Sequence, residues 1–144
     1  MPRFTKKKWS NKYVVNSHNC YSYMLNKINK KYVKLCKKYK KKTRKNKCGF
    51  LKAQPGLYSG MKDVRKTKFY SCKNLDKRIL ADNKYMYKTK KDCPKNYYKG
   101  MLFIHPKTTY HFYRQDKDGY WSHKPGRTDA RNTDSSNKKI INPL

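Results

Sequence analysis

The chain has 144 residues and a formal net charge of +31, from 39 lysine and arginine residues against eight acidic ones. This length fits a single domain, and because fourteen tyrosines outnumber five phenylalanines, we expect a core rich in tyrosine rings whose hydroxyl groups stay near water. No stretch approaches 18 consecutive apolar residues and no apolar segment follows the basic N-terminus, so the sequence predicts neither a membrane span nor a signal peptide.

The positive charge is concentrated in residues 1–62, which contain nineteen basic residues and no acidic one. Such a charge repels itself at low salt, so a counter-charge is expected from salt, nucleic acid, anionic lipid or an acidic protein. The lysine bias of an A- and T-rich genome is an alternative explanation for the amount of charge, although it does not explain the shortage of acids.

Cysteine spacing gives no metal or disulfide pattern. The chain has an odd number of cysteines and none of them forms a C-x-x-C pair: Cys20, Cys36, Cys48, Cys72 and Cys93. We therefore expect no zinc site, no cofactor and free thiols in an intracellular reducing compartment.

Residues 1–16 are predicted to be a basic N-terminal arm. From Ser17 apolar residues recur at helical spacing as far as Tyr39, which predicts one amphipathic helix with a lysine-rich outer face. The lysines of this face are candidate contacts for phosphates or other anions: Lys27, Lys30, Lys31, Lys34, Lys37, Lys38 and Lys41.

The later segments alternate between turns, a helix and strands. Glycines and Pro55 predict a turn over residues 54–60, and Leu75, Ile79 and Leu80 predict a helix from Ser71 to about Asn83. The unbroken apolar run in residues 100–105 predicts a strand covered on both faces and ended by Pro106. Residues 129–144 are predicted to form a polar tail or edge ribbon.

A hairpin is predicted around Asp118-Gly119, and its loop length decides where His123 points. With a two-residue loop, His123 would pair with Arg114 and point away from the face of His111. With the three-residue loop Lys117-Asp118-Gly119, His123 pairs with Tyr113 and shares the face of His111.

Cys20, near the start of the predicted helix, is a candidate nucleophile, because the free amides of a helix N-terminus stabilise a thiolate. His111 would be its general base, and His123 would orient His111. The resulting hypothesis is that the protein hydrolyses a peptide or amide substrate. The alternatives are that Cys20 is an ordinary buried thiol, and that His18 is a rival base.

Two blocks, Asn19-Cys20-Tyr21-Ser22-Tyr23 and residues 100–126, carry a resemblance to the NlpC-type branch of the papain-like cysteine hydrolases. Together they cover about a fifth of the chain. The resemblance implies an α+β papain-like domain over residues 17–128, with the cysteine helix packed on a small antiparallel sheet. The chain departs from that family in having Asn-Cys followed by tyrosines, where the cell-wall enzymes usually have Asp-Cys followed by small residues.

The middle of the chain, including Gln54-Pro55-Gly56 and residues 78–83, also looks like a set of small proteins from bacteria and large DNA viruses. Those proteins share an Asn-Cys-Tyr start and a block like the one from Tyr110 to Gly126. This gives a second hypothesis from a different class: a non-enzymatic basic structural or virion protein, such as a minor capsid or genome-packaging protein. Such a protein would bind nucleic acid or an acidic partner, for example an acidic capsid protein, through its lysines.

Overall fold

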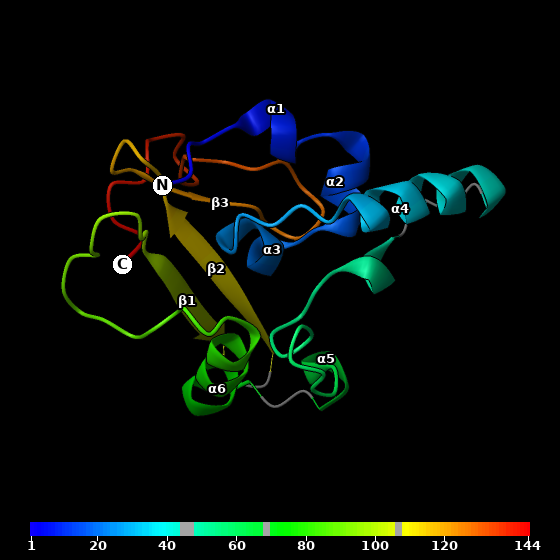
Figure 1. The fold of residues 1–144 in the computed structure, drawn as a ribbon. Coiled ribbons are helices and arrows are strands. Elements are labelled where there is room, and N and C mark those ends of the chain that lie inside the picture. The colour runs from blue at the N-terminus through cyan, green and yellow to red at the C-terminus, as the bar shows by residue number, and fades with distance from the viewer. Residues whose placement is uncertain (44–47, 68–69, 106–107) are drawn as a thin grey trace.

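A computed structural model describes residues 1–43, 48–67, 70–105 and 108–144. The fold is α+β, with short helices around an antiparallel sheet of order β1-β2-β3 (Figure 1). The elements are α1 (Lys6–Trp9), α2 (Lys12–Ser17), α3 (Cys20–Met24), α4 (Lys30–Thr43), the 3-10 helix η1 (Gly49–Leu51), α5 (Val64–Thr67), α6 (Cys72–Asp82), β1 (Gly100–His105), β2 (Thr109–Gln115) and β3 (Trp121–His123).

The predicted N-terminal arm is folded onto the rest of the protein. It forms α1 and most of α2, and α2 continues past the expected boundary at residue 16. Trp9 is 1% exposed, and its ring packs edge-on against Tyr23 with 4.8 Å between the ring centroids. Burial of this indole fixes the segment, since a large aromatic side chain contributes much apolar contact area.

The single long helix predicted from Ser17 was wrong, because the chain breaks between α3 and α4. Asn26 has a left-handed φ of 51°, a conformation that asparagine tolerates better than most residues. Asn29 then begins the next helix, with its side-chain oxygen accepting a hydrogen bond from the Tyr32 amide at 3.2 Å. The break lets Met24 enter the main core while Cys36 enters a separate cluster with Cys48 and Leu51.

The predicted helix after Ser71 is confirmed as α6, and the Ser71 side chain caps it by accepting from the Asn74 amide. The predicted strand is confirmed as β1, but its coverage on both faces was wrong. All four central residues of β1 are only half-buried, because β1 is an edge strand of the sheet. The expected stop at Pro106 lies outside the described residues.

The hairpin is confirmed, and of the two loop lengths considered the structure has the three-residue loop. Tyr113 pairs with His123 and Gln115 with Trp121, which leaves Lys117, Asp118 and Gly119 in the loop. Gly119 has a φ of 84°, as the left-handed position of such a loop requires. The tail from residue 129 forms the expected edge ribbon, since isolated bridges join Arg131 to His123 and Ile140 to Trp121.

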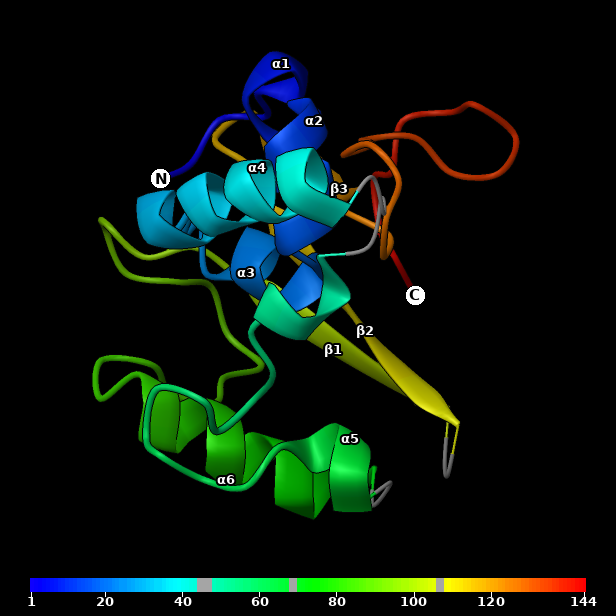
Figure 2. The same ribbon diagram turned by 90° about the vertical axis from the view of Figure 1, so that its right-hand side faces the viewer.

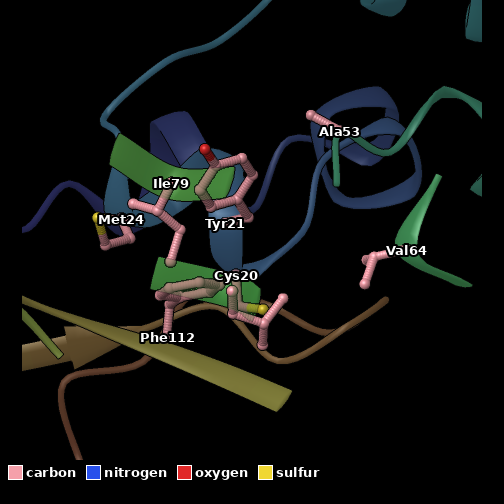
Figure 3. Close-up of a cluster of buried hydrophobic side chains, with 8 residues drawn as sticks. Cys20, Tyr21, Met24, Ala53, Val64, Ile79 and Phe112 are labelled. Carbon is pink, nitrogen blue, oxygen red and sulfur yellow. The ribbon is translucent and has the colours of Figure 1, made fainter. Parts of the chain in front are cut away.

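Helix α3 packs on one face of the sheet, chiefly on β2, and this contact forms the main core. Figure 3 shows Cys20, Tyr21 and Met24 of α3 gathered with Phe112 of β2 and Ile79 of α6. Figure 2 shows α4 beside α2, at the end of the molecule away from α5 and α6. The lysine-rich helix is therefore placed outside the main core.

Candidate functional site

Cys20 occupies the first turn of α3, as the sequence predicted. The Asn19 side chain caps this helix by accepting from the Ser22 amide, and its Nδ2 donates to the Ala53 carbonyl at 2.8 Å. Cys20 is 7% exposed and belongs to the apolar cluster formed with Tyr21 and Phe112 (Figure 3).

The surroundings of Cys20 favour the neutral thiol. Burial raises its pKa above the ordinary value, and this outweighs the backbone amides of Phe112 and Tyr21 and the charge of Lys124, which lower it. A nucleophilic cysteine requires the opposite balance, with the thiolate stabilised near neutral pH. The helix N-terminus alone does not activate this thiol.

His111 and His123 form the predicted pair. The distance from His111 Nε2 to His123 Nδ1 is 2.8 Å, and the Tyr113 ring stacks on His123 with 4.6 Å between centroids. Burial lowers the pKa of each imidazole to about 4. The neighbouring His123 lowers the pKa of His111 further, and the charge of Arg131 lowers the pKa of His123 further. Both rings are neutral at pH 7.

The structure does not bring Cys20 to this pair. Side chains alternate across a strand, and Phe112 packs against Tyr21 of α3 with 5.3 Å between ring centroids. His111, the preceding residue of β2, therefore points to the opposite face of the sheet, together with Tyr113. The convergence of the three side chains that the hydrolase hypothesis requires is not supported by this geometry.

His18 does not replace His111 as a base. It is 1% exposed, its Nδ1 lies 2.8 Å from Ser17 Oγ, and its Nε2 accepts a hydrogen bond from the Asn29 amide. Burial, helped by the charge of Lys124, lowers its pKa to about 4. Both ring nitrogens are thus occupied in joining the α2–α3 turn to the start of α4.

The group that sequence reasoning missed beside Cys20 is Lys124. It lies one residue beyond His123, so the alternation that takes His123 to one face takes Lys124 to the face of α3. Its buried Nζ donates to the carbonyls of His18, Gly126 and Val15 at 2.9, 2.9 and 3.2 Å. Burial and the nearby charge of Lys52 lower its pKa to about 7. Its hydrogen bonds join the segment after β3 to the residues that precede α3.

The predicted lysine face is present on α4. All seven predicted lysines are exposed: Lys27, Lys30, Lys31, Lys34, Lys37, Lys38 and Lys41. Lys27 lies before α4, with its Nζ 3.8 Å from the centroid of the Tyr58 ring. Within the described ranges, no carboxylate is within salt-bridge distance of an α4 lysine, since the ion pairs there involve Arg65, Lys88, Lys99 and Arg114.

The expectation of free thiols was wrong for Cys36 and Cys48, which form a disulfide between α4 and the segment before η1. The twelve-residue separation of these cysteines matches no short motif, and in the structure they share a buried cluster with Leu51, against which Tyr13, Tyr32 and Tyr39 pack. Cys20, Cys72 and Cys93 are free. Disulfides are typical of oxidising compartments.

Two further findings concern metals and membranes. The part of the chain that the structure describes holds no group of three or more histidine, cysteine or acidic side chains placed to bind a metal ion. None of its helices has the length and apolar character needed to cross a bilayer.

Comparison with known proteins gives one partial similarity. No family model matches the chain, and no solved structure matches it significantly. The chain is 62% identical over 42 residues to insoluble matrix shell protein 1 of Ruditapes philippinarum. The match covers 29% of this chain and 28% of that protein, so it is a similarity of a segment.

Proposed function

We propose that this protein is a non-enzymatic structural protein that binds acidic polymers through the lysine face of α4. The observation that carries the proposal is the row of exposed lysines on one helix, at positions 30, 34, 37 and 41, without a carboxylate partner in the described residues. Unpaired cations on a rigid helix attract a polyanion at long range, and binding releases counterions.

The disulfide and the partial relative favour an acidic partner outside the cell over nucleic acid. The Cys36–Cys48 bond anchors the lysine helix to the segment at Leu51, which holds its charges in a fixed arrangement. A disulfide fits an oxidising compartment, whereas the predicted intracellular location does not account for it. The relative is named as a matrix shell protein, and we extend this to a role in an extracellular matrix.

The papain-like form of the α+β fold is part of this proposal. It is supported by a cysteine in the first turn of a capped helix, packed on β2 of an antiparallel sheet. The hydrolase function is not part of it, because Cys20 is buried with a raised pKa and the histidine pair lies across the sheet. On this view the papain-like frame serves as a scaffold.

The test is the binding of polyaspartate, with duplex DNA as the competing polyanion, at about 0.15 M salt. We expect polyaspartate to bind, and we expect the logarithm of its affinity to decrease linearly with the logarithm of the salt concentration. Replacing Lys30, Lys34, Lys37 and Lys41 by glutamine should reduce the steepness of this salt dependence. The expected reduction is about 0.7 per lysine, the value for single-stranded nucleic acids, which are flexible polyanions.

A matched control replaces four exposed lysines far from α4: Lys73, Lys77, Lys90 and Lys95. This variant has the same net charge as the α4 variant. Equal losses in both variants would show that only total charge matters and would contradict a site on α4. Binding of DNA with no binding of polyaspartate would replace the acidic partner with nucleic acid, and hydrolysis that depends on Cys20 would overturn the non-enzymatic role.

A further inference from the structure

A cavity of about 610 Å³ lies between α6, β1 and the segment that joins them. It is separate from the lysine face of α4 and from the histidine pair. Ligand sites in proteins have volumes of about 300–1,000 Å³, so its size is that of a small-molecule site.

The lining of the cavity is apolar at its base. Met24, Ile79, Leu102 and Phe112 contribute to it and also belong to the main core or pack against it, and Met86 and Met101 add two further thioethers to the lining. Methionine side chains adapt to the shape of a flexible apolar group. The base is therefore suited to an alkyl chain.

Tyrosines and two lysines stand at the more exposed part of the same cavity. Tyr85 and Tyr87 are 67% and 50% exposed, and Lys88 and Lys99 also line the cavity. Lys88 is paired with Asp76, which is itself part of the lining. Lys99 is paired with Asp92, whose side chain is fully exposed and does not line the cavity.

This asymmetry makes Lys99 the cation available to a ligand. An exposed ion pair contributes little, so an anion entering the cavity can displace Asp92 from Lys99 at small cost. We propose that the cavity binds a linear amphiphile with one carboxylate, its alkyl chain against Met24, Met86 and Leu102 and its carboxylate at Lys99. This binding site goes beyond the proposed function and does not depend on it.

The test is calorimetric titration of the whole protein with octanoate, decanoate and dodecanoate, each below the concentration at which it forms micelles. We expect one ligand per chain. Binding should be about fourfold tighter for each added methylene until the cavity is full, because each buried methylene adds about the same free energy of binding. Affinity that does not depend on chain length, or several ligands per chain, would show adsorption to a cationic surface and overturn the proposal.

Two pairs of variants locate the ligand. Met86→Trp should fill the cavity and weaken dodecanoate binding at least tenfold, whereas Leu57→Trp, an exposed position outside the cavity, should leave it unchanged. Lys99→Gln should weaken dodecanoate but not dodecanol, and Lys42→Gln on α4 should affect neither.

Equal affinity of wild type and Met86→Trp would place the ligand elsewhere and overturn the site. Far-ultraviolet circular dichroism checks that each variant is folded. If Met86→Trp does not fold, the chain-length series on the wild-type protein still decides the question.

Binding of a uronic acid oligosaccharide in place of the alkyl carboxylates would assign the exposed tyrosines to sugar stacking and also overturn the proposal.

Discussion

The two faces of β2 differ in packing and in chemistry. Phe112 and Arg114 point toward α3 and are 1% and 0% exposed, whereas His111 and Tyr113 point away from it and are half-buried. On the α3 face, Arg114 donates to the Tyr23 carbonyl of α3 and to Asp116 of the hairpin, so this one side chain ties the helix to the sheet and to the hairpin. On the other face the two imidazoles contact mainly each other and Tyr113.

The comparison shows how strand alternation separates residues that have a suitable order in the sequence. Cys20 and His111 follow the order of a cysteine hydrolase, but the residues of β2 that meet α3 include Phe112 and Arg114 and not His111. A shift of one position along β2 would exchange the two faces. The face toward α3 therefore carries stability, and three predictions test this division.

The largest effect is expected for Asp116→Ala, which removes the counter-charge of Arg114 on the α3 face. Asp116 is 1% exposed and also accepts a short hydrogen bond from Ser122, so its loss leaves a buried guanidinium unpaired. We expect the free energy of unfolding to fall by about 3–5 kcal/mol, measured by urea denaturation. Asp92→Ala, which removes an exposed pair, is the control and should leave the urea midpoint nearly unchanged.

An intermediate effect is expected from pH on the histidine face. The pKa values of His111 and His123 are lowered to about 4, while the unfolded chain binds these protons near pH 6.5. The unfolded state is thus favoured progressively as the pH falls from 6.5 to 4. His18, with a pKa also near 4, adds to the same trend.

Urea midpoints at pH 7.5, 6.0, 5.0 and 4.5 measure this dependence. The double variant His111→Gln and His123→Asn should lose part of the decline below pH 6.5, and His105→Gln, at an exposed position of β1, should retain it. A double variant with the same pH dependence as wild type would show that the pair is not protonated on unfolding as described.

The smallest effect is expected for the reactivity of Cys20. With the thiol buried and its pKa raised, iodoacetamide at pH 8 should modify Cys20 at least tenfold more slowly than the exposed Cys72 in the same molecule. Mass spectrometry of the peptides measures both rates. Faster reaction of Cys20 than of Cys72, or reaction well below pH 8.5, would restore the nucleophile hypothesis.

Local patterns were sufficient for the elements with strong signals. Ser71 and the apolar spacing that follows it predicted α6, and the apolar run predicted β1. Asp118-Gly119 predicted the hairpin, and its three-residue loop set the His111–His123 contact at 2.8 Å. These features depend on neighbours in the chain, on turn geometry and on alternation within one hairpin, so they are encoded locally.

Other features depended on contacts between distant segments. The apolar stripe from Tyr21 to Tyr39 has the spacing of one helix, but its residues divide among three clusters because the chain breaks at Asn26. The Cys36–Cys48 bond lies in one cluster and the buried Trp9 of the predicted arm lies in another, and each cluster joins segments that are distant in the sequence.

The sequence by itself determined the charge, the lysine face and the helix over residues 72–82, because each follows from composition or from spacing along one element, and it limited the hairpin to two loop lengths, of which the three-residue loop brings the two histidines together. Only the tertiary structure decided that Cys20 meets Phe112 and Lys124 and not His111. The physical reason is that packing of α3 selects one face of β2, and that choice is made by buried contacts between residues about ninety positions apart, which no local pattern records.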